Sequence, residues 1–301
     1  MSTILQINSI SELHKALNLE EPKHSLITII NVCDVEIKQE IIDVKVVTNL
    51  YCIAVKDVPC GLKYGRTNYD YENGSLIFTA PYQALIATET QEKNEKQGWL
   101  LFFHPDLLMK FSLAEKINQY NFFGYSTNEA LHLTKDERNT LNNLISNIRA
   151  EFTQTIDHHG KSLIISNLEL LLNYSKRYYD RQFSTRSPEN KSIAVKFEGI
   201  LNAYFEKSVT VGEELSLNEY FSGKMNLSSN YLSDLLKKET GYSTKEHINN
   251  IVLKRAKNKL LGTNDSVREI AFSLGYNYPH YFTRFFKSKI GMTPSKYRNV
   301  S

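Results

Sequence analysis

The chain has 301 residues, of which 41% are hydrophobic, a length and composition typical of a two-domain globular protein. No apolar run reaches the roughly 18 residues of a membrane-spanning helix, and residues 1–17 lack the pattern of a secretory signal, so neither is expected. Residues 1–189 contain 19 Lys and Arg against 23 Asp and Glu, net −4, whereas residues 190–301 contain 17 against 10, net +7. This basic C-terminal part favours a polyanionic partner, with solvated Lys-rich helices as the alternative.

Residues 1–132 have the composition of a β-rich domain. Four stretches are dense in β-branched and aromatic residues, and the Asn73-Gly74 pair before the third is a hairpin signal. Short strands separated by turns predict a small β-barrel or sandwich. The expected strands lie within Ser25–Ile37, Val44–Lys56, Ser75–Ala80 and Gly98–Leu108.

The cysteines indicate reduced thiols. Cys33, Cys52 and Cys60 are odd in number and have no CxxC spacing. This pattern predicts a cytoplasmic protein and argues against a disulfide framework or a zinc site, with a redox sensor as the alternative.

The histidines of this region do not form a catalytic or metal-binding pattern. His14, His24 and His104 are scattered, and His158-His159 are adjacent in an expected loop, where consecutive side chains diverge. No nucleophile elbow, phosphate-binding loop or dinucleotide fingerprint occurs. We therefore expect no catalytic residues, no metal and no cofactor.

Residues 133–181 are predicted to form a helical hairpin. Thr134 and Glu137 have the spacing of a capping box, and apolar residues then recur on one helical face. A second apolar helix is expected over Lys161–Tyr179, and the short connection between the two helices favours antiparallel packing. The hairpin is a candidate dimer contact, with packing against the β-rich domain as the alternative.

The next segment, residues 182–192, is polar and contains one proline, so it is the expected interdomain linker. Residues 193–301 are predicted to form an all-α domain. A long helix is expected over Lys245–Leu261, because its apolar residues recur at helical spacing.

Two related helix pairs flank that long helix. The second pair, Ser266–Arg298, combines the Ser266–Glu269 capping box, Gly275 at the first helix end and Pro279 at the start of the next helix. The first pair begins near Leu217. Its sequence NYLSDLLKKETG parallels HYFTRFFKSKIG of the second pair. Both segments therefore predict a helix-turn-helix with an apolar back and a polar front.

These motifs, together with the closing GMTPSKYR, resemble the AraC/XylS family of bacterial transcription regulators, and members from Bacteroidetes in particular. The resemblance implies an α+β protein: an N-terminal cupin-like β-barrel with the helical hairpin, then two helix-turn-helix units joined by the long helix. It implies double-stranded promoter DNA as partner, read in two successive major grooves. A small-molecule effector, RNA polymerase and a homodimer are further implied partners, while effector, target genes and sign of regulation stay open.

The resemblance also carries site residues over to this chain. The base-facing positions would be Ser229, Asn230, Ser233 and Asp234 in the first unit, and His280, Tyr281, Thr283 and Arg284 in the second. Three further cations are expected to contact phosphate without reading sequence, and these are Lys237, Lys287 and Arg298.

The chemistry of three of these side chains differs. Arg284 suits a guanine edge and Asn230 an adenine edge, each with two hydrogen bonds. Asp234 either accepts from cytosine or pairs with Lys237 or Lys238 in its own helix. The alternative for each residue is a solvated side chain. We also expect the first unit to be the softer one, because Gly223 falls inside its first helix.

Two other functions stay open for the β-rich domain. It could be a small-molecule enzyme fused to a DNA reader, or a ligand-free scaffold for dimerisation. The candidate pocket aromatics are Tyr51, Tyr64, Tyr69 and Tyr71, with ordinary core or surface positions as the alternative.

Overall fold

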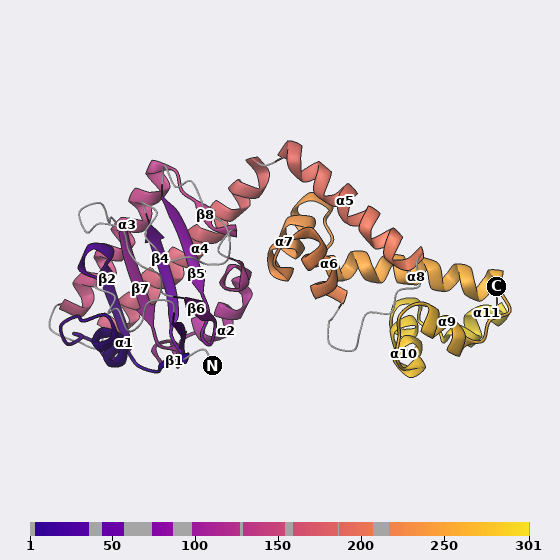
Figure 1. Ribbon diagram of the computed structural model, residues 1–301, viewed down its shortest axis with the longest axis horizontal. Helices are drawn as coiled ribbons and strands as arrows, with labels where there is room; N and C mark the ends of the chain where they lie inside the picture. The colour runs from indigo at the N-terminus through magenta and orange to yellow at the C-terminus, as the bar shows by residue number, and fades with distance from the viewer. Residues whose placement is uncertain are drawn as a thin grey trace. The chain divides into compact units, whose positions relative to one another are not determined.

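The computed structural model divides the chain into two compact units, residues 1–185 and residues 186–301 (Figure 1). The structure describes residues 4–35, 44–56, 74–86, 98–126, 129–153, 159–185, 187–206 and 217–300.

The N-terminal unit contains two sheets. One has the strand order β1-β3-β6 and the other the order β2-β7-β4-β5-β8, and among the described strand pairs only β1–β3 is parallel. The strands are β1 (Ile4–Ile7), β2 (Ile27–Asn31), β3 (Lys45–Thr48), β4 (Tyr51–Lys56), β5 (Ser75–Thr79), β6 (Ala84–Ile86), β7 (Gly98–Phe103) and β8 (Leu131–His132).

All four expected strand regions therefore contain strands, and the mixed α+β class is confirmed. The expected cupin-like barrel is not confirmed, because the described strands form two separate open sheets. The last expected strand ends at Phe103, and Pro105 begins a short 3-10 helix, η4 (Pro105–Leu108). His104 caps that helix by accepting a hydrogen bond from the Asp106 N–H at Nδ1.

The larger sheet is covered on both faces, which explains why its strands are continuous hydrophobic runs and not alternating ones. On one face, α1 (Ile10–Ala16) packs against Cys52 and Ala54 of β4. On the other face, Phe78 of β5 contacts Tyr179, and Trp99 of β7 donates a hydrogen bond to Asn142.

The second covering layer is the predicted helical hairpin, formed by α3 (Lys135–Thr153) and α4 (Gly160–Thr185). The capping box is present, since the Thr134 N–H donates to Glu137 Oε2 at 2.9 Å. The two helices are antiparallel, because Arg181 near the end of α4 donates to Glu137 at the start of α3, with an Nε–Oε1 distance of 2.8 Å.

The expected linker, residues 182–192, is helical on both sides of residue 186. Helix α4 continues to Thr185, and α5 (Ser187–Glu206) begins two residues later. Tertiary contacts explain the extension of α4. The amide of Gln182 is buried, where it accepts from the His132 N–H and donates to the Ala130 carbonyl.

Every secondary-structure element in the described part of the C-terminal unit is a helix. A single hydrophobic core joins its helices, with Phe197, Phe221, Phe282 and Phe286 fully buried in it. After α5 come α6 (Leu217–Met225), α7 (Ser229–Thr240), α8 (Thr244–Gly262), α9 (Val267–Ser273), α10 (Pro279–Ile290) and α11 (Pro294–Val300).

The predicted long helix is α8. Its buried residues are spaced at four-residue intervals, so one side of the helix faces the core. Ser243 and Glu246 form a capping box at the N-terminus of α8, in which each side chain accepts a hydrogen bond from the backbone N–H of the other residue. This capping box was not predicted from the sequence. No helix in the described part of the chain is long and apolar enough to cross a membrane.

Candidate nucleic-acid interface

The second helix-turn-helix consists of α9 and α10, and its turn is stabilised locally. Ser266 and Glu269 form the predicted capping box, and these hydrogen bonds lower the pKa of the Glu269 carboxyl. Gly275 adopts the predicted positive φ of 86°, and the next N–H donates to the Ala271 carbonyl at 3.1 Å. Pro279 begins α10 as predicted.

The first helix-turn-helix, α6 and α7, repeats this turn with different residues. Asn226 takes the left-handed conformation with a φ of 55°, and the Leu227 N–H donates to the Ser222 carbonyl at 3.1 Å. Asn226 thus corresponds to Gly275, and asparagine is a side chain that tolerates this conformation. Ser228 caps α7 through the Tyr231 N–H. The sequence interpretation missed both Asn226 and Ser228.

The second helices of the two units also end alike. Gly241 and Gly291 follow α7 and α10 with φ values of 82° and 84°, and each N–H bonds to the carbonyl four residues earlier. The predicted repeat is therefore a structural repeat: a left-handed turn, an amphipathic helix and a glycine cap, built twice.

The apolar back of each second helix is anchored in the core. In α10, Phe282 and Phe286 are fully buried, and Tyr276 of the preceding turn packs on Phe282 with ring centroids 5.5 Å apart. Burial raises the pKa of Tyr276 to about 12, so its phenol stays neutral at physiological pH. In α7 the buried residues are Tyr231, Leu232, Leu235 and Leu236.

The predicted DNA-contacting residues lie on the opposite faces of these helices. Asn230 and Lys237 of α7 are exposed, and so are His280, Tyr281, Arg284 and Lys287 of α10. Ser233, Asp234 and Thr283 are partly buried. The structure thus places the two sets on two helices that are equivalent in construction.

The tyrosines that align in the two repeats have different environments. Tyr231 is 2% exposed and belongs to the core, whereas Tyr281 is 55% exposed. The ring of Tyr281 contacts His280, with centroids 4.2 Å apart. The second unit therefore presents two aromatic rings beside Arg284, a surface that the first unit lacks.

Ser229 and Arg298 have partners within the protein. The Ser229 hydroxyl lies 2.9 Å from that of Ser222, which is buried in α6. The Arg298 guanidinium donates to two backbone carbonyls, from Nε to Leu260 at 3.0 Å and from Nη2 to Asp265 at 2.6 Å. These bonds hold the C-terminal end of α8. The expected phosphate contact by Arg298 is untested, and these two bonds favour a structural role for its side chain instead.

Of the candidate residues of the N-terminal unit, Tyr51 and His14 are partly buried. Tyr51 stacks on Phe103 at 5.0 Å, and burial raises its pKa. His14 bonds to the Thr28 hydroxyl through Nε2 at 2.9 Å, while His159 is exposed. Six residues of the sequence predictions fall outside the described ranges, namely Cys60, Tyr64, Tyr69, Tyr71, Asn73 and His158. Among the described residues, no three His, Cys, Asp or Glu side chains cluster as metal ligands would.

Comparisons with known proteins identify the C-terminal unit. Residues 221–299 match the family described as a helix-turn-helix domain. The chain is 36% identical over 247 residues to the HTH-type transcriptional regulator YobQ of Bacillus subtilis, covering 79% of this chain and 91% of YobQ. It is 31% identical over 147 residues to YfiF of the same organism, another HTH-type transcriptional regulator. That match covers 49% of this chain and 43% of YfiF, less than half of that relative.

A solved structure is similar as well. The C-terminal domain of AraT, a response regulator from Geobacillus stearothermophilus, is 30% identical. The match covers 36% of this chain and 85% of that domain, with a TM-score of 0.32. With the paired helix-turn-helix units and the relation to YobQ, the conclusion is plain: the chain belongs to the AraC-type family of helix-turn-helix transcription regulators.

Proposed function

We propose that this regulator binds promoter DNA sequence-specifically, with α7 and α10 in two successive major grooves. The observation that carries the proposal is the repeated construction of the two units, each with a buried apolar back and an exposed polar front. Helix α8 joins them and has 19 residues, about 28 Å at 1.5 Å per residue. This length is close to the roughly 34 Å between successive major grooves on one side of a duplex.

Base recognition is assigned to the exposed side chains of both helices. Arg284 would donate to a guanine edge and Asn230 would pair with an adenine edge. His280 and Tyr281 would provide apolar and polar contacts beside Arg284, while Lys237 and Lys287 would contact phosphate. In the first unit, Asp234 occupies the position that Arg284 has in the second unit, so the two half-sites should differ in sequence.

The N-terminal unit is assigned effector sensing or dimerisation. Leu163 and Leu170 of α4 support dimerisation, because these large apolar side chains are 45% and 44% exposed. Leu163 and Leu170 are seven positions apart, about two helical turns, so they lie on the same side of the helix. RNA polymerase is the family's partner in activation, and we propose it as a partner of this chain because the chain belongs to that family.

Selection of fragments from a random duplex library by the full chain tests the proposal. We expect a motif with two blocks about one helical turn, 10 to 11 base pairs, apart. Arg284→Ala should relax one block and Asn230→Ala the other, while Lys254→Ala, which removes an exposed cation of α8 outside both recognition helices, should leave the motif unchanged. Binding that falls steeply with salt and enriches no sequence would refute base reading.

A further inference from the structure

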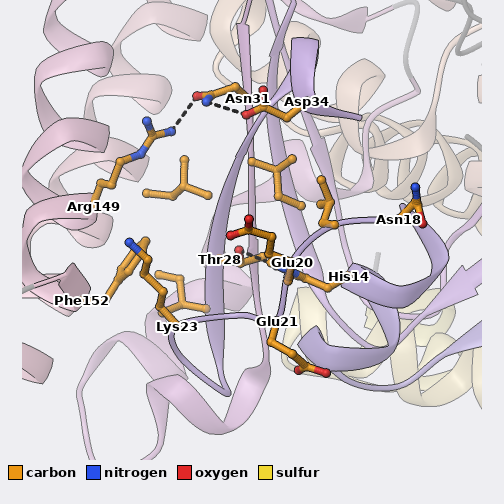
Figure 2. Close-up of a pocket in the computed structure, with 14 residues that line it drawn as sticks. His14, Asn18, Glu20, Glu21, Lys23, Thr28, Asn31, Asp34, Arg149 and Phe152 are labelled. Atoms are coloured by element: carbon orange, nitrogen blue, oxygen red, sulfur yellow. Dashed lines mark hydrogen bonds between the residues drawn. The ribbon is translucent and has the colours of Figure 1, made fainter. Parts of the chain in front are cut away.

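A pocket in the N-terminal unit lies along the edge strand β2. Its volume is about 510 Å³, within the range of small-molecule sites. Figure 2 shows β2 in the middle, Arg149 and Phe152 on one side, and His14 and Glu21 on the other. All five residues of β2 line the pocket. Since successive side chains of a strand point to opposite faces, a pocket reaching all five residues must face the strand's edge.

The hydrogen-bonding pattern of β2 supports this placement. In the described part of the sheet, β2 pairs with β7 alone. The His104 N–H donates to the Leu26 carbonyl at 2.8 Å, which places that pair at a hydrogen-bonded position. Bonded positions alternate along an antiparallel pair. The backbone N–H and C=O groups of Ile27, Ile29 and Asn31 therefore point away from β7, toward the pocket.

The walls of the pocket carry charges of both signs. Arg149, near the end of α3, donates from Nη2 to the Asn31 side-chain oxygen at 2.9 Å. Asn31 in turn donates to the Asp34 carboxylate at 2.8 Å, so this amide is fixed between a cation and an anion. Glu20, Glu21 and Lys23 also line the pocket. A guanidinium matches a carboxylate in geometry, and carboxylates attract an ammonium group.

We propose that this pocket binds a short peptide with free termini, about three residues long, which adds to the sheet along β2. The peptide backbone would pair with the outward groups of Ile27, Ile29 and Asn31. Arg149 would take the peptide carboxylate, and Glu20 with Glu21 its ammonium group. A neutral sugar carries no charged group for Arg149, Glu20 or Glu21 to recognise, and a single amino acid would leave the strand edge unpaired.

Such a peptide would join two elements of the unit. Ile29 belongs to β2 and Arg149 to α3, so an occupant of the pocket ties the end of α3 to the sheet edge. The action of this peptide as an effector rests on the proposed regulatory function. Peptide binding itself needs no DNA.

The test is affinity selection by the full chain from a pool of tripeptides with free termini, followed by mass spectrometry of the retained peptides. Matched pools are the same tripeptides with acetylated and amidated ends, and free amino acids. We expect enrichment from the free tripeptide pool alone. Arg149→Ala should lower the enrichment about tenfold or more, and so should Glu21→Gln, a change of similar size at an exposed residue. Lys176→Ala, an exposed cation on α4 away from the pocket, should retain it.

No enrichment from the free tripeptide pool would overturn the inference. Equal enrichment of blocked peptides would overturn the role of the charges, and selection of single amino acids would overturn strand addition. The DNA selection described above separates the two proposals. If the chain enriches a DNA motif and retains no peptide, only the proposed peptide binding is refuted. If it retains peptide and enriches no DNA motif, only the proposed regulatory function is refuted.

Discussion

Replacement of Arg298 by alanine distinguishes a structural role from a DNA-contacting role. The guanidinium makes two hydrogen bonds to carbonyls, at 3.0 Å to Leu260 and at 2.6 Å to Asp265. A hydrogen bond from a charged group contributes about 1.5–3 kcal/mol when it is well buried. Arg298 is only partly buried, so we discount the two bonds to about 2 kcal/mol in total. With a urea dependence of about 2 kcal/mol per molar, the unfolding midpoint should fall by about 1 M.

The assay follows urea unfolding of the C-terminal unit by hydrogen exchange in peptides from α8 and α11. The salt dependence of DNA binding is measured in parallel. Loss of one phosphate contact lowers the slope of log K against log salt by about 0.9. Arg298→Ala should lower stability and leave this slope unchanged. Lys287 is exposed, so Lys287→Ala should lower the slope and leave stability unchanged. Unchanged stability with a reduced slope for Arg298→Ala would refute the structural assignment.

Three further changes test the turn, the pH dependence and the dimer. Gly275→Ala should cost about 1–2 kcal/mol of unfolding free energy, because φ is 86° while an added Cβ meets nothing closer than 3.8 Å. Asn226→Gly should lower the unfolding free energy by less than Gly275→Ala does. Equal losses of stability for the two variants in thermal unfolding would contradict this reasoning. Burial lowers the pKa of His247 below 6.5, so the unfolded chain binds a proton that the folded chain does not. The stability of the C-terminal unit should therefore fall as the pH decreases through about 6.5, and His247→Gln should weaken this dependence in urea titrations at pH 5 and pH 8. The chain should be a dimer in sedimentation equilibrium, with Leu163 and Leu170 in the interface, and Leu170→Asp should give a monomer; a wild-type monomer at tens of micromolar would refute this.

The sequence by itself determined the features that depend on short-range hydrogen bonds. The Ser266–Glu269 capping box spans three residues, so it needs no tertiary partner to form. The positive φ of Gly275 and the start of α10 at Pro279 likewise follow from the backbone preferences of single residues. Helical periodicity located α8 for the same reason, since it places apolar side chains on one face.

Only the tertiary structure decided how distant segments meet. Arg298 bonds to Leu260, 38 residues away, and no local pattern distinguishes this contact from one to phosphate. Tyr231 and Tyr281 align in sequence, yet packing buries one and exposes the other. The pocket is also undetermined by local pattern, because Arg149 bonds to Asn31 across 118 residues. Short-range preferences act on neighbouring dihedral angles, whereas burial and charge pairing depend on which elements the folded chain brings together.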